Sequence, residues 1–182
     1  MAVYSYPDFI LQLYGLTQIP YEVSLFKTAC QSYGWQVAIP EWVEPDDESI
    51  IEVHSPLWPV PLVALFSEEQ MAGLFLFALI GEFDQEDDYS GRGPEWFNAR
   101  FADAHTEIKA VLGEPSDLGQ YSGTFDHSIF SYAVWAGGFS DLVLVQHEEG
   151  DGNFGHDATI DIRIIPHDGS SLVFPLQTNL IF

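Results

Sequence analysis

The sequence predicts an α+β domain in which an antiparallel β-sheet packs against one or more amphipathic helices. Three observations predict this class. Apolar residues recur at helical spacing in two segments, apolar and polar residues alternate in the C-terminal third, and glycine-containing turns separate the alternating segments. A sheet with a helix on one face buries both patterns. We expect one domain spanning residues 1–182, with residues 1–40 as a candidate N-terminal helical annex.

The N-terminal part contains two helical patterns. The short apolar stretch from Asp8 to Leu16 predicts a helix turn or two. The second pattern has Pro20 at a first helical position and Gly34 as its C-terminal cap. In this second pattern apolar residues recur at alternating intervals of four and three, namely Ile19, Val23, Phe26, Cys30 and Tyr33.

The next part of the chain reads as short strands separated by prolines and acidic turns. A short apolar run does not show its period, so the last of these segments leaves helix and strand open. Gly73 and the acidic loop after Phe83 favour a strand there. The predicted strands are Trp35–Ile39, Ile50–Val53, Leu62–Phe66 and Leu74–Phe83.

The clearest helix begins at Pro94. Pro94 and Glu95 suit the first turn, Gly113 is placed to cap the end, and Pro115 prevents continuation. The apolar stripe of this helix is Phe97, Phe101, Ala104, Ile108 and Val111.

The C-terminal third predicts an antiparallel meander with one buried face. The segment His127–Trp135 alternates, a partner strand covers residues 142–146, and a glycine-rich acidic loop runs from Glu148 to Gly155. Alternation then resumes over residues 160–164, and a last strand is expected over residues 172–176.

The charge balance is the strongest functional signal. The chain has 5 Lys and Arg against 28 Asp and Glu, a formal net charge of −23. With 14 Phe, 8 Tyr and 5 Trp it has the aromatic content of a folded core, unlike an acidic disordered chain. Such a surface repels nucleic acid and anionic membranes and attracts basic proteins. Nucleic-acid binding is also disfavoured because phosphate contacts need several Lys or Arg, and these five are scattered.

No chemical motif has the spacing that its chemistry needs. Cys30 is the single cysteine and falls in an apolar helical pattern, so we expect it to pack as a small hydrophobic residue. No zinc spacing, nucleophile elbow or phosphate-binding loop occurs. The loop from His147 to Asp157 fits no EF-hand register, although a looser cation site near Asp151 stays open. We expect no enzymatic activity, cofactor or metal.

Three acidic clusters in predicted loops are the candidate partner-binding residues. A charge run is usually a solvated loop tip, but three clusters with so few basic residues would together present carboxylates to a basic partner if they share a face. Tyr89 and Phe154 are nearby candidate anchors. The clusters are Asp46, Asp47 and Glu48; Asp84, Glu86, Asp87 and Asp88; and Glu148, Glu149 and Asp151.

The N-terminus has no basic segment or small-residue cleavage site, and the most apolar run, residues 71–81, is too short to span a membrane. We therefore expect a cytoplasmic protein that does not bind membranes.

Residues 74–165 resemble the small immunity proteins of bacterial toxin–immunity pairs, including those cognate to type VI-secreted or polymorphic toxins. The resemblance rests on a pattern of strand, helix, Leu-Gly-x-Pro and β-meander. Its residues are Phe83-Asp84, Trp96-Phe97, Leu112-Gly113-Glu114-Pro115, Tyr132 with Trp135, and Leu142 with Leu144. It implies a protein that occludes the active site of its toxin. If the toxin is a nuclease, the acidic inhibitor acts as a mimic of the nucleic-acid backbone.

We therefore expect a non-enzymatic inhibitor of a basic protein, most naturally an immunity protein for a secreted nuclease toxin. Two alternatives stay open. One is a small-molecule-binding or hydrolytic enzyme domain with a pocket between helix and sheet. The other is a structural or oligomeric component, for which the apolar end Asn179–Phe182 would supply a contact patch.

Overall fold

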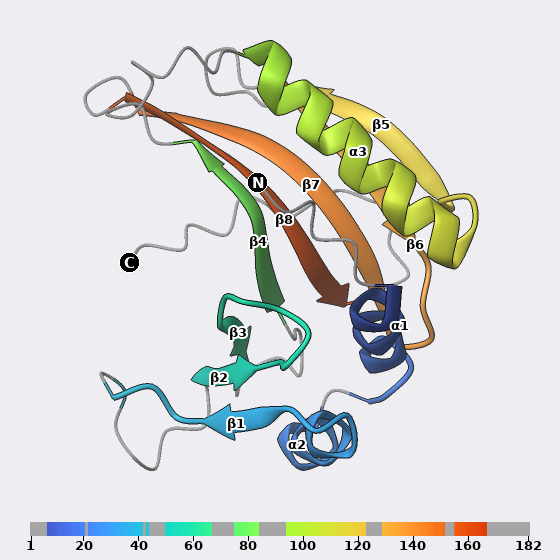
Figure 1. The fold of residues 1–182 in the computed structure, drawn as a ribbon, viewed down its shortest axis with the longest axis vertical. Coiled ribbons are helices and arrows are strands. Elements are labelled where there is room, and N and C mark those ends of the chain that lie inside the picture. Colours follow the sequence, from blue (N-terminus) through green and yellow to red (C-terminus); the bar gives the residue numbers. More distant parts are fainter. Residues whose placement is uncertain are drawn as a thin grey trace.

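The computed structural model describes residues 7–20, 22–41, 43, 50–66, 75–83, 94–122, 129–151 and 155–166. Figure 1 shows the elements in these ranges. The helices are α1 (Pro7–Leu16), α2 (Val23–Ser32) and α3 (Pro94–Leu112). The strands are β1 (Gln36–Ala38), β2 (Ile50–His54), β3 (Leu62–Leu65), β4 (Phe75–Phe83), β5 (Asp117–Ser122), β6 (Ile129–Trp135), β7 (Ser140–Asp151) and β8 (Gly155–Pro166).

The described strands form an antiparallel sheet in the order β1-β2-β3-β4-β8-β7-β6-β5. Strand β4 joins two sections, because it pairs with β3 on one side and with β8 on the other. In the second section β5, β6, β7 and β8 follow one another as a meander. The predicted α+β class with a C-terminal meander is therefore confirmed.

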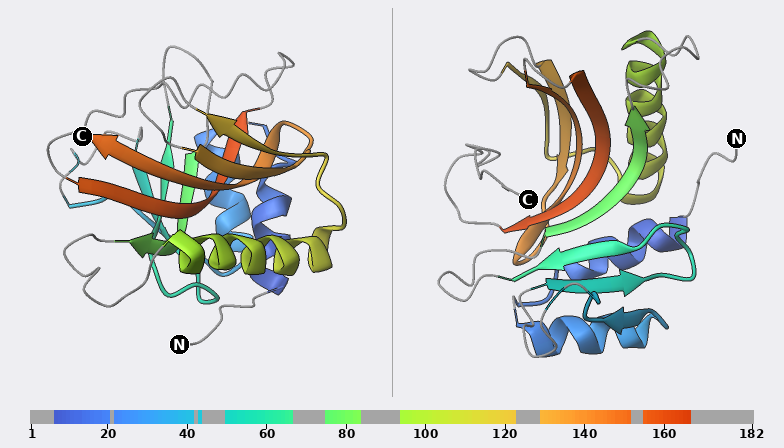
Figure 2. Two further views of the ribbon diagram at one scale, coloured as in Figure 1. Left: turned by 90° about the horizontal axis from the view of Figure 1, so that it is seen from above. Right: turned by 90° about the vertical axis from the view of Figure 1, so that its left-hand side faces the viewer.

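The second section of the sheet is strongly curved, and α3 lies along its convex side (Figure 2). Helix α3 packs its stripe of Phe101, Ala104 and Ile108 into the core. Two polar contacts hold it across the strands. Gln146 Nε2 of β7 donates to Asn98 Oδ1, 2.8 Å away, and Trp135 Nε1 of β6 donates to the Gly113 carbonyl at 3.0 Å.

The N-terminal helices share the hydrophobic core with the sheet. Phe9 of α1 stacks on Trp58 at a ring separation of 4.8 Å and contacts Trp35 at 5.8 Å, in the same cluster as the side chains of β6, β7 and β8 that face α3, such as Trp135, Leu144 and Ile162. The end of α1 also bonds to the turn between β6 and β7. The backbone N–H of Phe139 donates to the Thr17 carbonyl at 2.9 Å.

Several local predictions are confirmed. Gly34 and Gly113 follow their helices with φ of +76° and +86°, the left-handed conformation that glycine adopts without steric cost. Residues 75–83, ambiguous from the sequence, form a strand. Cys30 is fully buried in the core.

The structure corrects two predictions at the helices and adds a strand. Pro20 does not begin α2, since it lies in a turn closed by the N–H of Glu22 on the Pro20 carbonyl, and the helix begins at Val23. Helix α1 is ten residues long rather than a turn or two. The added strand is β5, which forms although its Asp and Gly residues are poor strand formers. The strand expected over residues 172–176 lies outside the described residues.

The expectation of one buried face is wrong for the centre of the meander. All residues from Leu142 to Gln146, and from Ile160 to Ile164, are buried. Alternate residues of a strand face opposite sides of the sheet, so consecutive buried residues mean that both faces are covered. The face away from α3 contributes a second, smaller cluster of Val134, Val143 and Val145.

Within the described ranges, none of the helices combines the length and the apolar character that crossing a bilayer requires.

Candidate functional site

Two of the three predicted acidic clusters fall outside the described residues. These are Asp46, Asp47 and Glu48, and the cluster Asp84, Glu86, Asp87 and Asp88. The backbone of the third cluster, Glu148, Glu149 and Asp151, is described and lies in β7.

The third cluster is in a strand rather than in the predicted loop. The loop prediction is wrong for Glu148–Asp151 and for Gly155, because β7 continues to Asp151 and β8 begins at Gly155, whereas residues 152–154 lie outside the described residues. Acidic residues and glycine disfavour strands, but a register of twelve consecutive pairs between β7 and β8 overrides that local preference. Glu148, Glu149 and Asp151 are therefore set out along an ordered ladder.

The register of this ladder concentrates negative charge. It aligns Glu149 with Asp157, and like charges at directly opposed positions destabilise a sheet. The neighbouring sequence supplies no basic residue to offset them. Residues 110–162 contain nine Asp and Glu and no Lys or Arg. The segment that forms β5, β6, β7 and most of β8 therefore has carboxylates and no Lys or Arg to offset them.

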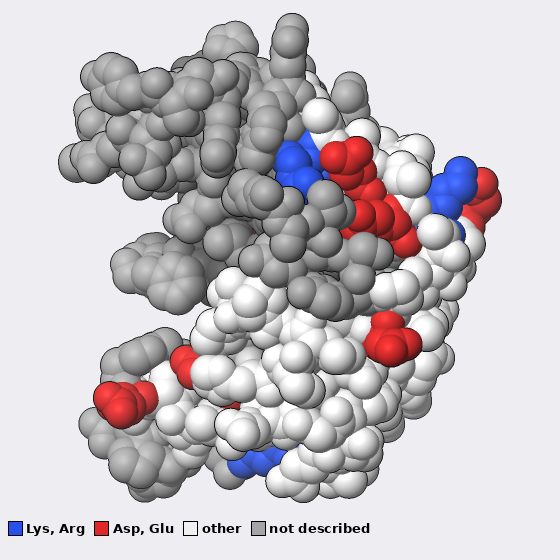
Figure 3. All heavy atoms as spheres, viewed as in Figure 1, with Lys and Arg blue, Asp and Glu red and all other residues white. Residues whose placement is uncertain are grey.

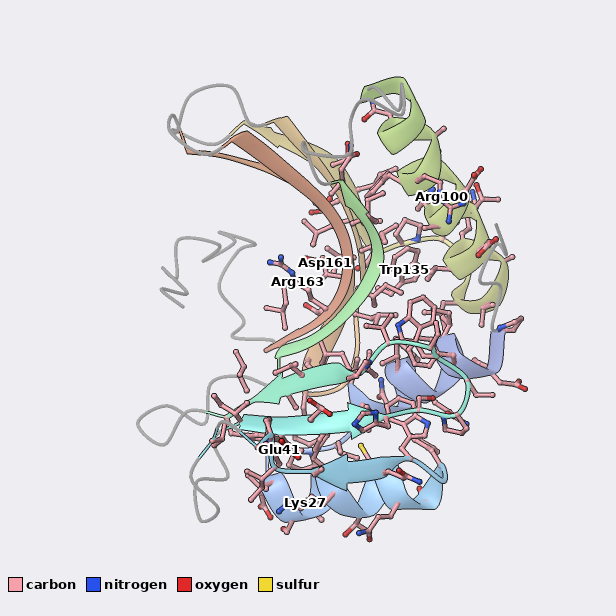
Figure 4. All side chains as sticks on the ribbon, turned by 60° about the vertical axis from the view of Figure 1, so that its left-hand side comes forward. Lys27, Glu41, Arg100, Trp135, Asp161 and Arg163 are labelled. Carbon is pink, nitrogen blue, oxygen red and sulfur yellow. The ribbon has the colours of Figure 1, made fainter. Side chains whose placement is uncertain are left out.

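Arg163, the basic residue of β8, forms a buried ion pair with Asp161. Arg163 Nη2 lies 2.7 Å from Asp161 Oδ2, and the two side chains are only 9% and 7% exposed. Figure 4 shows both on the side of the sheet away from α3, whereas Trp135 lies on the side toward α3. The ladder places them opposite Val143 and Val145, so the pair sits in an apolar environment.

Asp141 is buried near the start of β7. Its Oδ1 accepts the backbone N–H of Gly137 at 3.1 Å and so braces the turn between β6 and β7.

The predicted meander with one buried face would place Asp161 and Arg163 on the exposed face, since they alternate with Ile160, Ile162 and Ile164. The signal that could have found the pair is their opposite charge at positions two apart, which alternation assigns to the same face.

The outward side of α3 is a second acidic surface. Arg100 Nη1 lies 3.9 Å from Asp103 Oδ2, and Lys109 Nζ lies 2.7 Å from Glu114 Oε1. Partial burial raises the pKa of Glu107, Arg100 nearby lowers it, and the charge of Asp103 raises it. Figure 3 shows acidic atoms gathered where Figure 1 places α3, with basic atoms at the border.

The basic side chains therefore do not form a positive surface in the described part of the molecule. Of the four Lys and Arg described there, Arg100, Lys109 and Arg163 each pair with a carboxylate. Carboxylates such as Asp103, 63% exposed, remain in excess. This arrangement supports a site for cationic ligands rather than for phosphate groups.

The buried Cys30 is poorly placed for nucleophilic chemistry. Burial raises the pKa of Cys30 to about 12, so its thiol stays protonated near neutral pH and is a poor nucleophile. Across the described ranges, no three His, Cys, Asp or Glu side chains gather in a way that could hold a metal ion. His105 of α3 lies against Trp135 with a ring separation of 5.9 Å, and its Nε2 is buried without a hydrogen-bond partner.

Comparison of the chain with protein-family models, with curated proteins and with solved structures finds no match.

Proposed function

We propose that this protein is a non-enzymatic, cytoplasmic inhibitor that binds and occludes a basic partner protein through its acidic surface. The partner is a secreted nuclease toxin, so that the protein acts as its immunity protein and its carboxylates take the place of nucleic-acid phosphates. The observation that carries the proposal is the unbalanced charge, −23 over 182 residues.

The distribution of charge supports a binding role over a structural one. A protein with a large negative charge is destabilised by self-repulsion, so an excess of this size is costly for the folded chain itself. The basic residues Arg100, Lys109 and Arg163 reduce this repulsion only locally, through their own ion pairs. The acidic segment from residue 110 to 162 has nine Asp and Glu and no basic residue of its own, and these ion pairs involve only two of the nine, Glu114 and Asp161. A basic partner would supply positive charge for the others.

The site that a nuclease presents to nucleic acid is rich in Lys and Arg, because phosphate neutralisation dominates that affinity. An acidic surface is complementary to such a site, steers the encounter and adds specificity. The same surface disfavours nucleic acid and anionic lipid as partners.

The test is a capture experiment with the purified full chain and the lysate and secreted fraction of its source organism. Capture is run at about 0.01 M and at about 1 M salt, where the Debye length is about 30 Å and about 3 Å. We expect one basic protein, recovered stoichiometrically at low salt and depleted at high salt. Its nuclease activity should fall on titration with this protein, reaching zero near equimolar addition.

Three results would overturn the proposal. The first is the absence of any basic protein at both salt concentrations. The second is a stoichiometric partner that is acidic or neutral. The third is a basic partner whose association rate does not change with ionic strength.

A further inference from the structure

Strand β5 leaves one edge of the sheet unpaired among the described strands. It is the terminal strand of the sheet order and pairs through six consecutive residues with β6 alone. The other terminal strand, β1, is three residues long and packs beside α2. An unpaired edge is a template for another strand, and proteins usually protect it with charged side chains, above all lysine, with proline, with a bulge or with a covering element. The sequence of β5, DLGQYS, has one charged residue, Asp117, and neither lysine nor proline, and its register has no bulge.

The two faces of this edge differ in character. Leu118 aligns with the buried Ala133, so it belongs to the face that packs toward α3, and its side chain is 56% exposed. On the other face Tyr132 crosses Gly119. A Cβ atom at Gly119 would lie 2.6 Å from the Tyr132 hydroxyl and 2.8 Å from the ring carbon that bears it. Gly119 thus leaves room for an aromatic ring next to the edge.

Asp117 places a carboxylate on the same face as this ring. Its Oδ1 accepts the backbone N–H of Leu118 at 2.9 Å, and its Oδ2 accepts the hydroxyl of Tyr132 at 3.4 Å. Burial raises the pKa of Tyr132, and the neighbouring Asp117 raises it further, so the hydroxyl remains a neutral donor. The N–H of Leu118 and the hydroxyl of Tyr132 are both uncharged donors, so neither neutralises the negative charge of Asp117.

We propose that the β5 edge is a docking strand, and that an extended basic segment of the partner protein pairs with it to add a ninth strand beside the eight described. The segment alternates aliphatic residues, which cover Leu118, with Lys or Arg residues, which lie beside Asp117 and the Tyr132 ring. This inference rests on the proposed function and assigns the surface and the chemistry of recognition.

Charge selects this occupant over a second copy of the chain. Pairing two β5 edges would bring together two copies of the segment from residue 110 to 162, which contains nine Asp and Glu and no Lys or Arg. Like charges across adjacent strands oppose pairing, whereas opposite charges favour it. Main-chain hydrogen bonds give such strand addition its affinity, and alternate side chains give it specificity.

The first test uses a capped peptide of alternating Lys and Val residues, long enough to span β5, as the probe. Its affinity for the full-length protein is measured by titration calorimetry at about 0.1 M salt. The controls are two peptides of the same sequence that are N-methylated at alternate backbone nitrogens, one in each phase. They keep the charge and lose main-chain donors. We expect at least one methylated peptide to bind about tenfold more weakly, since lost edge hydrogen bonds are each worth about 1 kcal/mol.

The second test compares Leu118→Lys with Leu11→Lys. The two leucines are 56% and 51% exposed, and both substitutions add one positive charge, so they change the overall field equally. Leu11 lies on α1, away from the edge. We expect L118K to weaken peptide binding about fivefold more than L11K, because it adds a like charge beside the incoming strand. Circular dichroism of both variants establishes that each is folded.

Each outcome decides the proposal. Equal binding of all three peptides, no peptide binding, or equal effects of L118K and L11K would overturn the docking strand. A homodimer in sedimentation that L118K abolishes would also overturn it, in favour of a second copy. If one of these outcomes is observed but a basic partner is still captured in a salt-dependent way, only the docking-strand proposal is wrong and the proposed function stands. If no basic partner is captured, the proposed function fails as well.

Discussion

The buried pair of Asp161 and Arg163 allows a stability prediction whose size follows from the structure. The charged atoms are 2.7 Å apart, both side chains are more than nine-tenths buried, and the facing residues of β7 are Val143 and Val145. Removing one partner of such a pair leaves a charge in an apolar environment, at a cost of about 3–5 kcal/mol. We expect Asp161→Asn to lower the free energy of unfolding by about 3 kcal/mol.

The assay is urea unfolding followed by tryptophan fluorescence, together with thermal melting. For a chain of this size, about 3 kcal/mol corresponds to a fall in Tm of about 6–12 °C. The matched control is Asp103→Asn, the same substitution in the exposed pair with Arg100, where the separation is 3.9 Å and Asp103 is 63% exposed. The control should change stability by less than about 0.5 kcal/mol, as most exposed ion pairs do.

A double variant distinguishes the loss of the whole ion pair from the cost of leaving one charge buried without its partner. Asp161→Leu combined with Arg163→Met removes both charges and should be more stable than either single variant, since apolar replacement of a buried pair is often neutral. A loss below about 1 kcal/mol for Asp161→Asn, or a double variant as unstable as the sum of the singles, would refute the reasoning.

Three further predictions concern other parts of the molecule. Gly137→Ala should destabilise the fold by about 2 kcal/mol or more in urea unfolding, because a Cβ there would lie 2.0 Å from the Ser140 carbonyl oxygen and 2.3 Å from Thr17 Oγ1. Glu107→Gln should raise Tm at about pH 7 and leave it unchanged well below the ordinary pKa of 4.5. The raised pKa of Glu107 means that its charged form is disfavoured by folding, so the wild type loses stability as pH rises through that range. Cys30 should resist thiol reagents in native buffer and react fully in denaturant, given its burial and its pKa of about 12; rapid native labelling would contradict this.

The sequence predicts the fold well where one periodic pattern dominates. The stripe containing Phe101, Ala104 and Ile108 identified α3, and glycine marked the helix ends at Gly34 and Gly113. It failed where tertiary pairing overrides local preference. Strand β5 forms on β6 despite Asp117 and Gly119, because pairing with β6 satisfies the backbone along one edge and Tyr132 covers the glycine.

For the candidate site too, the sequence predicts what depends on composition and misses what depends on strand pairing. Composition alone established the excess of carboxylates, since it depends only on counts. The position of those carboxylates depends on register, which the sequence does not show. The sequence predicts Glu149 in a glycine-rich loop, whereas pairing of β7 with β8 aligns it with Asp157. Likewise, Arg163 counts as one of five basic residues in composition, but its burial against Asp161 removes it from the surface.

This distribution of charge leads to a prediction in which salt acts in opposite directions on the free protein and on the complex. Self-repulsion among carboxylates destabilises the free chain, and salt screens it, so the Tm of the free protein should rise between about 0.01 M and about 0.5 M sodium chloride. Sodium chloride is used because it is a weaker general stabiliser than sulfate or phosphate. Attraction between the acidic surface and a basic partner is screened by the same salt, so the stabilisation that the partner adds should shrink. Two melting series, with and without the captured partner, measure both effects in one buffer. A free protein whose Tm is unchanged or falls over this range would show that its carboxylates do not repel one another strongly, and the argument that a basic partner relieves that repulsion would lose its basis.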